Sequence, residues 1–114
     1  MNIKIVGTED KTQGRLYKIE VAAKEVELLL TWHSLERIDV WNLKPEQVLE
    51  TLLFPEEVET GHNNRFIAHK RYNGHIIRAV YEYDINLPFL VTVYYPTAKR
   101  YFKGGRNFAD KILP

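Results

Sequence analysis

Two histidine–arginine pairs in the sequence could contact or cleave a phosphodiester. His33 and Arg37 are four residues apart, which places them on one face if their segment is helical. His69 and Arg78 flank a turn-forming pair and would lie opposite each other across a hairpin. A neutral imidazole can act as a general base, and a guanidinium can hold a phosphate with two hydrogen bonds. The alternatives are that His33 ends a strand while Arg37 pairs with an acid, and that His69 and Arg78 form a polar pair on a solvated face.

A third group interleaves aromatic and basic side chains near the end of the chain. Its members are Tyr94, Tyr95, Lys99, Arg100 and Tyr101. Such a pattern suits single-stranded nucleic acid, because the cations hold phosphates and the rings stack on bases. Tyrosine is also a common strand residue, so the pattern is not specific. Lys70 and Arg71 in the basic hairpin are further candidate RNA contacts.

The sequence lacks the residues that most other kinds of functional site need. There is no cysteine, no pair of histidines at metal-ligand spacing, no glycine-rich phosphate loop and no GxSxG motif. We therefore expect no metal and no cofactor. If the protein is an enzyme, this inventory fits acid–base catalysis, such as RNA cleavage through the 2′-hydroxyl. That reaction needs a base, cations for the phosphate and a proton donor for the leaving oxygen.

Charge is distributed unevenly along the 114 residues, although the formal net charge is only +1. Acidic residues crowd the middle of the chain, and the balance reverses after Gly61. The basic residues of that second part are Arg65, Lys70, Arg71, Arg78, Lys99, Arg100, Lys103, Arg106 and Lys111, against only Glu82, Asp84 and Asp110. A basic half favours an anionic partner such as RNA or an acidic protein, and ordinary charge scatter is the alternative.

The elements that must position these residues are strands first and then helices. Alternating polar and apolar residues predict strands at NIKIV (residues 2–6), LYKIEVA (16–22) and VELLLTW (26–32), although AAKEVELLL could also form a helix. Apolar residues at helical spacing then predict a short helix over residues 34–40 and a second over 45–54. Pro45 fits the first turn of the second helix, where its missing N–H costs nothing.

A hairpin and a buried strand follow. Asn73–Gly74 is the strongest short hairpin signal, because a type I′ turn needs positive φ at both positions. A two-residue loop fixes the register, so that His69 faces Arg78 and Arg65 faces Glu82. The nearly continuous apolar run FLVTVYY (residues 89–95) predicts a strand interior to the sheet. The tail after residue 101 is predicted to hold a short helix at NFADKIL (residues 107–113) or to be partly disordered.

Length and composition limit the number of domains and the kinds of protein to which the chain can belong. We expect one domain, with N-terminal strands over residues 1–28, a core over 29–101 and a basic tail over 102–114. No apolar run approaches the roughly 20 residues that span a bilayer, and no signal peptide is recognisable. The sequence therefore predicts a soluble, cytoplasmic protein without a membrane partner.

Four motifs in order resemble a family of small bacterial and archaeal proteins of unassigned function. These motifs are LTWHSLERI, LKPEQVLETLLFPEEV, RFIAHKRYNGHIIRAVYEY and FLVTVYYPTAKRY. That family is similar in outline to the RelE/ParE and BrnT-like toxins of toxin–antitoxin pairs. In that family a basic, glycine-containing helix end commonly follows the arginine of the first motif, whereas this chain reads IDVWNLKP, and the first 23 residues lie outside the resemblance.

The resemblance implies an α+β fold, in which two helices pack on one face of a small antiparallel sheet, here with an extra N-terminal β-hairpin. It also implies a basic site for RNA on the other face. The matching positions are His33, Arg37, Arg78, Tyr95 and Lys99. The expected function is a metal-independent endoribonuclease neutralised by an antitoxin protein. The alternative is a non-catalytic RNA- or protein-binding module of the same fold.

Overall fold

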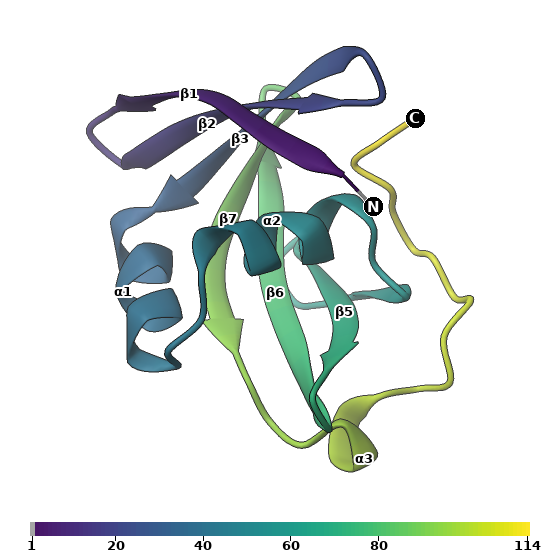
Figure 1. Ribbon diagram of the computed structural model, residues 1–114. Helices are drawn as coiled ribbons and strands as arrows, with labels where there is room; N and C mark the ends of the chain where they lie inside the picture. The colour runs from purple at the N-terminus through teal and green to yellow at the C-terminus, as the bar shows by residue number, and fades with distance from the viewer. Residues whose placement is uncertain (1) are drawn as a thin grey trace.

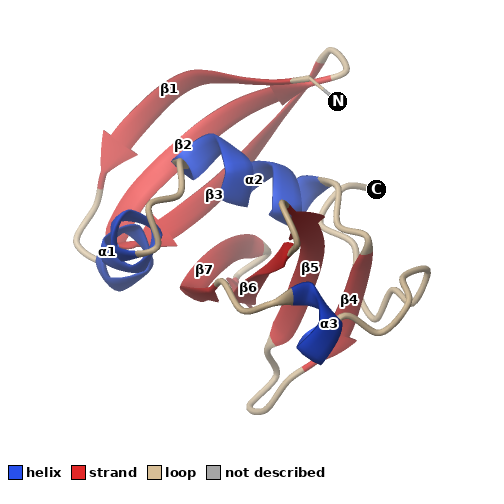
Figure 2. Ribbon diagram, turned by 60° about the horizontal axis from the view of Figure 1, so that its bottom comes forward, coloured by secondary structure: helices blue, strands red, loops and turns tan. Residues whose placement is uncertain are grey.

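A computed structural model describes residues 2–114 as one seven-stranded sheet with three helices (Figures 1 and 2). In chain order the elements are β1 (Ile3–Asp10), β2 (Gly14–Val21), β3 (Lys24–Thr31), α1 (Trp32–Val40), α2 (Pro45–Leu53), β4 (Glu57–Thr60), β5 (Phe66–Tyr72), β6 (His75–Asp84), β7 (Leu87–Tyr94) and α3 (Ala98–Tyr101). The α+β class expected from the sequence is confirmed. β4 was not expected, and α1 begins two residues earlier than predicted.

The sheet consists of two antiparallel meanders in the spatial order β1-β2-β3-β7-β6-β5-β4. They meet where β3 and β7 run parallel, with Leu29 opposite Phe89 and Leu30 opposite Leu90. The expectation of a purely antiparallel sheet is therefore wrong at this one junction. Parallel neighbours need a crossover connection, and the chain between β3 and β7 contains α1, α2 and the second meander. Figure 1 shows the first meander turned steeply away from the second, so the sheet is strongly twisted.

Both longer helices contribute to a single apolar core. Ile38 of α1 and Val48, Leu49 and Leu52 of α2 are almost completely buried against strand residues such as Ile77. Local chemistry fixes where the helices start. The hydroxyl of Thr31 accepts a hydrogen bond from the amide of Ser34 at 3.1 Å and caps α1. Pro45 opens α2, as the sequence predicted.

The predicted hairpin is confirmed with its register. Asn73 and Gly74 have φ values of 51° and 78°, as a type I′ turn requires, and His69 lies directly opposite Arg78. Arg65 and Glu82 approach to 3.7 Å at the far end of the hairpin. Paired residues on neighbouring antiparallel strands point to the same face, so His69 and Arg78 share one face of the sheet. Ala68 and Ala79 lie opposite each other on the other face, which α2 covers (Figure 2).

β7 lies between β3 and β6, as its apolar sequence predicted, but only its first half is paired on both sides. Among residues 2–114 the backbone pairing of β7 with β3 ends at Leu90, and the backbone carbonyl of Val93 accepts a hydrogen bond from the indole of Trp41 at 3.0 Å. The second half of β7, which ends at Tyr94, is therefore a free edge of the sheet beside α1.

The C-terminal tail runs along the outer edge of β4 and is not helical at residues 107–113. The helix predicted there is wrong, since α3 ends at Tyr101. The amide of Val58 donates to the carbonyl of Asn107, and the amide of Ala109 donates to the carbonyl of Val58, both at 2.8 Å. The pairing covers an edge strand that would otherwise present unpaired backbone groups, and this competes successfully with helix formation.

Asp110 fastens the tail to the sheet. Its carboxylate accepts hydrogen bonds from the hydroxyls of Tyr81 and Tyr83 at 2.7 and 2.6 Å. Burial, and then the hydrogen bond to Asp110, raise the pKa of both phenols above the ordinary range. Both tyrosines therefore stay protonated as donors at any pH at which the protein is expected to work. Within residues 2–114, no helix is long and apolar enough to cross a membrane.

Candidate functional site

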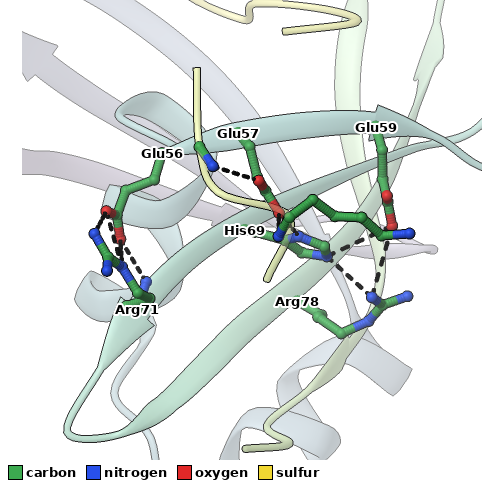
Figure 3. Close-up of polar contacts among 8 residues, drawn as sticks. Glu56, Glu57, Glu59, His69, Arg71 and Arg78 are labelled. Atoms are coloured by element: carbon green, nitrogen blue, oxygen red, sulfur yellow. Dashed lines mark hydrogen bonds and ion pairs between the residues drawn. The ribbon is translucent and has the colours of Figure 1, made fainter. Parts of the chain in front are cut away.

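Arg78 is the centre of a polar cluster on the face of the sheet that α2 does not cover (Figure 3). Its Nη1 lies 3.0 Å from Nε2 of His69 and 3.6 Å from a carboxylate oxygen of Glu59. The Tyr101 ring of α3 packs against the guanidinium, with the ring centroid 4.5 Å from Cζ. The side chain is 16% exposed, so it reaches solvent from a largely enclosed position.

Beneath Arg78 lies a buried histidine–carboxylate pair. His69 has no exposed surface and Glu57 is 2% exposed. Nδ1 of His69 is 2.6 Å from a carboxylate oxygen of Glu57, whose two oxygens also accept the amides of Lys103 and Gly105 at 2.9 Å. The alternative that His69 and Arg78 form a polar pair on a solvated face is wrong for His69, because Glu57 of the short strand β4 and the loop at residues 103–105 lie over it.

The hydrogen-bond chemistry fixes the tautomer of His69. An arginine can only donate, so Nε2 of His69 must accept from Arg78 and Nδ1 must carry the proton that it donates to Glu57. Both ring nitrogens are therefore occupied, and the lone pair that a general base would use points at the guanidinium. In this arrangement His69 holds Arg78 in place and cannot reach a substrate proton.

Glu57 is ionised despite its burial. Removal from water alone would raise the pKa of this carboxyl, but the hydrogen bonds from His69 and from the amides of Lys103 and Gly105 outweigh that effect and lower the pKa below its ordinary value. The carboxylate thus connects β4, β5 and the C-terminal loop through three donors.

Arg78 also lines a cavity of about 320 Å³ with aromatic walls. The other lining residues are Trp41, Tyr94, Tyr95, Pro96 and Tyr101. We call this cavity the Arg78 groove. Tyr94 and Arg78 are directly opposite each other on β7 and β6, which explains why both side chains enter the same space. The mainly aromatic lining and the single cation suit a flat, apolar group that carries a negative charge.

The aromatic walls are held by contacts outside the cavity. The hydroxyl of Tyr95 donates to the backbone of Tyr72 at 3.2 Å, and its ring stacks on His75 with centroids 4.6 Å apart. The indole of Trp41 is fixed by its hydrogen bond to Val93. These anchors keep the rings in place without a ligand, which lowers the entropic cost of binding one.

His33 and Arg37 lie on α1 beside the free edge of β7. Nε2 of the exposed His33 is 3.3 Å from the hydroxyl of Thr92, and Arg37 approaches the Trp41 ring at 5.7 Å. Thr92 is two residues before Tyr94 on the same strand, so alternation puts their side chains on the same face. α1 thus brings His33 to the face of the sheet that carries the Arg78 groove, and Arg37 to one of its walls.

The remaining predicted RNA contacts separate into two sets. Lys70 lies on the α2 face, where its Nζ donates to the carbonyl of Phe54 at 3.1 Å. Arg71 forms a two-pronged ion pair with Glu56, as close as 2.7 Å. Neither is brought to the groove. Lys99 and Arg100 are exposed on α3, next to Tyr101.

The basic half of the sequence is therefore only partly a basic surface. Glu56, which comes just before β4, and Glu59 of β4 pair with the hairpin arginines Arg71 and Arg78, and this neutralises much of the charge that the sequence places there. In this half of the chain, the cations that have no carboxylate within 4.0 Å among residues 2–114 are Lys99, Arg100, Lys103, Arg106 and Lys111, all exposed. The first four lie along α3 and the loop after it, and we call these four the cationic segment.

Sequence reasoning missed two parts of the site. Glu57 and Glu59 alternate with apolar Val58 in a four-residue strand, but the surrounding acidic run hides that alternation. No sequence pattern marked Trp41 as a site residue, because its place in the groove depends on where β7 ends. Across the described part of the chain, no group of three or more His, Cys, Asp or Glu is arranged to hold a metal ion.

Comparison of the chain with protein-family models, with curated proteins and with solved structures finds no match. What the Arg78 groove binds must therefore follow from its own residues.

Proposed function

We propose that the protein binds single-stranded RNA, with a phosphate on Arg78 and the following phosphates on the cationic segment. The observation that carries this proposal is the fixed guanidinium at the aromatic groove. Only Nη1 of Arg78 is engaged by residues 2–114, which leaves Nη2 and Nε available for a bidentate contact with phosphate. His69 and Glu57 hold the group in position from behind.

The cationic segment indicates the path that the RNA would take beyond the groove. Tyr101 lines the groove, and the exposed Arg100 and Lys103 stand on either side of it in the sequence. A strand that leaves the groove along α3 would meet these charges in turn. Aromatic rings beside a line of cations are the usual means of binding single strands without base pairing.

A second candidate is metal-independent cleavage of the bound RNA. It is favoured by His33, whose imidazole is exposed and bonded only weakly to Thr92, on the same face as the groove. The 2′-oxygen would attack the phosphorus as its bond to the 5′-oxygen breaks. His33 would take the proton of the 2′-hydroxyl and return it to the leaving 5′-oxygen, Arg78 would stabilise the charge on the phosphate, and the buried His69 would hold Arg78 in position. In this version an antitoxin protein of acidic character would neutralise the enzyme by covering the groove and the cationic segment.

The test compares Arg78→Ala with a matched arginine elsewhere. Arg15 on β2 also pairs with a carboxylate, Asp10 at 2.8 Å, and also lies over an indole ring, that of Trp32 at 5.5 Å. We expect wild type and Arg15→Ala to bind a short single-stranded RNA equally and more weakly at higher salt. Arg78→Ala should bind about 10- to 100-fold more weakly, from the usual strength of charge-assisted hydrogen bonds.

Cleavage is measured in the same samples in the presence of a chelator. If the second candidate is right, wild type cleaves the RNA and His33→Ala binds it but does not cleave it. Binding without cleavage leaves the non-catalytic module. Absence of salt-dependent binding, or equal losses in Arg78→Ala and Arg15→Ala, would refute the proposed site.

A further inference from the structure

We infer that the Arg78 groove holds one unpaired nucleotide, with its base among the aromatic rings and its phosphate on Arg78. This inference rests on the proposed function and narrows it. An RNA strand could lie across the surface and touch only cations. A base inserted into the groove would instead make the groove a specific subsite, which a free mononucleotide should also occupy.

The size of the cavity supports a single nucleotide. Its volume of about 320 Å³ is near the lower end of small-molecule sites, which are typically 300–1,000 Å³. The cavity is therefore too small for a helix or a folded loop of a partner. A base from a duplex could enter only after unpairing, so the groove should discriminate against double-stranded RNA.

The chemistry of the walls supports a flat aromatic ligand. Tyr94 is 48% exposed and has no aromatic, ionic or hydrogen-bonded partner for its side chain among residues 2–114. The rings of Tyr95 and Tyr101 already use one face each, on His75 and on Arg78. The half-exposed Tyr94 ring is thus the free stacking surface, and every nucleobase offers a complementary flat face.

The position of the cation supports a phosphate next to the base. Arg78 and Tyr94 face each other across neighbouring strands, so a base stacked on Tyr94 would place its sugar–phosphate close to the guanidinium. An acidic peptide would satisfy Arg78 but would gain little from an exposed phenol ring. The combination of one free ring and one fixed guanidinium favours a nucleotide.

Trp41 provides a direct probe, because it lines the groove and the chain has only one other tryptophan, Trp32. In the Trp32→Phe variant, all tryptophan fluorescence reports on the groove. We expect a nucleoside monophosphate to change this emission at millimolar concentration or below. A nucleoside without phosphate, or inorganic phosphate without a base, should bind at least about tenfold more weakly, since each lacks one of the two contacts. Calorimetry on the wild type gives the same comparison without a substitution.

Tyr94→Ala is the decisive variant, and Phe108→Ala is its control. Phe108 is exposed to a similar degree, 41% against 48%, and it lies on the C-terminal tail outside the groove. Tyr94→Ala should weaken mononucleotide binding by about fivefold to a hundredfold, which is the usual effect of removing a stacking ring. Phe108→Ala should leave it unchanged.

The outcomes separate this inference from the proposed function. Salt-dependent RNA binding without any mononucleotide binding, and unaffected by Tyr94→Ala, would overturn the nucleotide subsite and keep the RNA-binding surface. Mononucleotide binding lost in Tyr94→Ala, in a protein that does not bind longer RNA, would uphold the subsite and overturn the wider proposal. Equal competition by an acidic peptide without aromatic residues would also overturn the nucleotide assignment.

Discussion

Replacing Glu57 with alanine is the most severe test of the buried cluster. Three donors would lose their acceptor, namely Nδ1–H of His69 and the amides of Lys103 and Gly105. Leaving a buried donor without its acceptor typically costs about 1–3 kcal/mol, so three such donors together should cost about 3 kcal/mol or more. Since small domains are stable by only about 5–15 kcal/mol, this loss should lower the melting temperature by roughly 10–20 °C.

The assay is urea unfolding at neutral pH, with two glutamine variants beside Glu57→Ala. Glu57→Gln keeps one acceptor oxygen in place and should lose less stability than Glu57→Ala. Glu56→Gln is the matched control, because this neighbouring carboxylate pairs with Arg71, whose side chain is 57% exposed. Its effect on the midpoint should be small, as is usual for pairs in contact with water. A Glu57→Ala midpoint close to that of Glu56→Gln would refute the reasoning.

Three further predictions concern acid stability, the tail and the turn. Folding lowers the pKa of Glu57, so the unfolded chain takes up the proton first as the pH falls. The contribution of this carboxylate to the free energy of unfolding is complete above the ordinary pKa of 4.5 and is lost as the pH falls through the folded value. Between about pH 7 and about pH 3, the free energy of unfolding of Glu57→Gln should therefore decrease less steeply than that of the wild type. Asp110→Asn weakens the bonds from two tyrosines, so amide exchange should become faster at residues 107–110 and stay unchanged in β6. Gly74→Ala should cost about 1–2 kcal/mol in urea unfolding because of its φ of +78° alone, since no atom would meet the added methyl group, whereas Gly7→Ala on β1 should be nearly neutral. Unchanged acid dependence, unchanged exchange or equal costs for the two alanines would contradict the respective prediction.

The hairpin could be predicted in full because its information is local. Asn73–Gly74 determines the turn type, the turn determines the register, and the register places His69 opposite Arg78. The same holds for the start of α2 at Pro45. At these places the sequence next to the element is sufficient, since turn and cap chemistry act over a few residues.

The burial of that pair could not be predicted, because it depends on distant segments. His69 is covered by Glu57, twelve residues earlier, and by the loop at Lys103 and Gly105, more than thirty residues later. The alternation of polar and apolar residues along the hairpin does not reveal what lies over its polar face. The tail shows the same limit: residues 107–113 suit a helix locally, yet the unpaired edge of β4 binds them in extended form.

The resemblance to toxins remains a prediction about function. It placed His33, Arg37, Arg78 and Tyr95 in one site, and α1, β6 and β7 do bring these residues to one side of the sheet, around the Arg78 groove. Lys99 lies outside the groove, on α3. RNA cleavage by the wild type that is lost in His33→Ala would distinguish a nuclease from an RNA-binding module.

Mapping a short single-stranded RNA onto the ¹⁵N-labelled protein by NMR tests the central claim most directly. The two indole N–H signals serve as probe and internal control. Trp41 lines the Arg78 groove, whereas the indole of Trp32 donates to the carbonyl of Thr12 at the first meander. We predict that the Trp41 indole and the amides of Arg78, Tyr94 and Tyr101 shift on titration, while the Trp32 indole does not. Shifts confined to the Trp32 side or to the α2 face, or no shifts at low salt, would contradict the claim that this groove binds RNA.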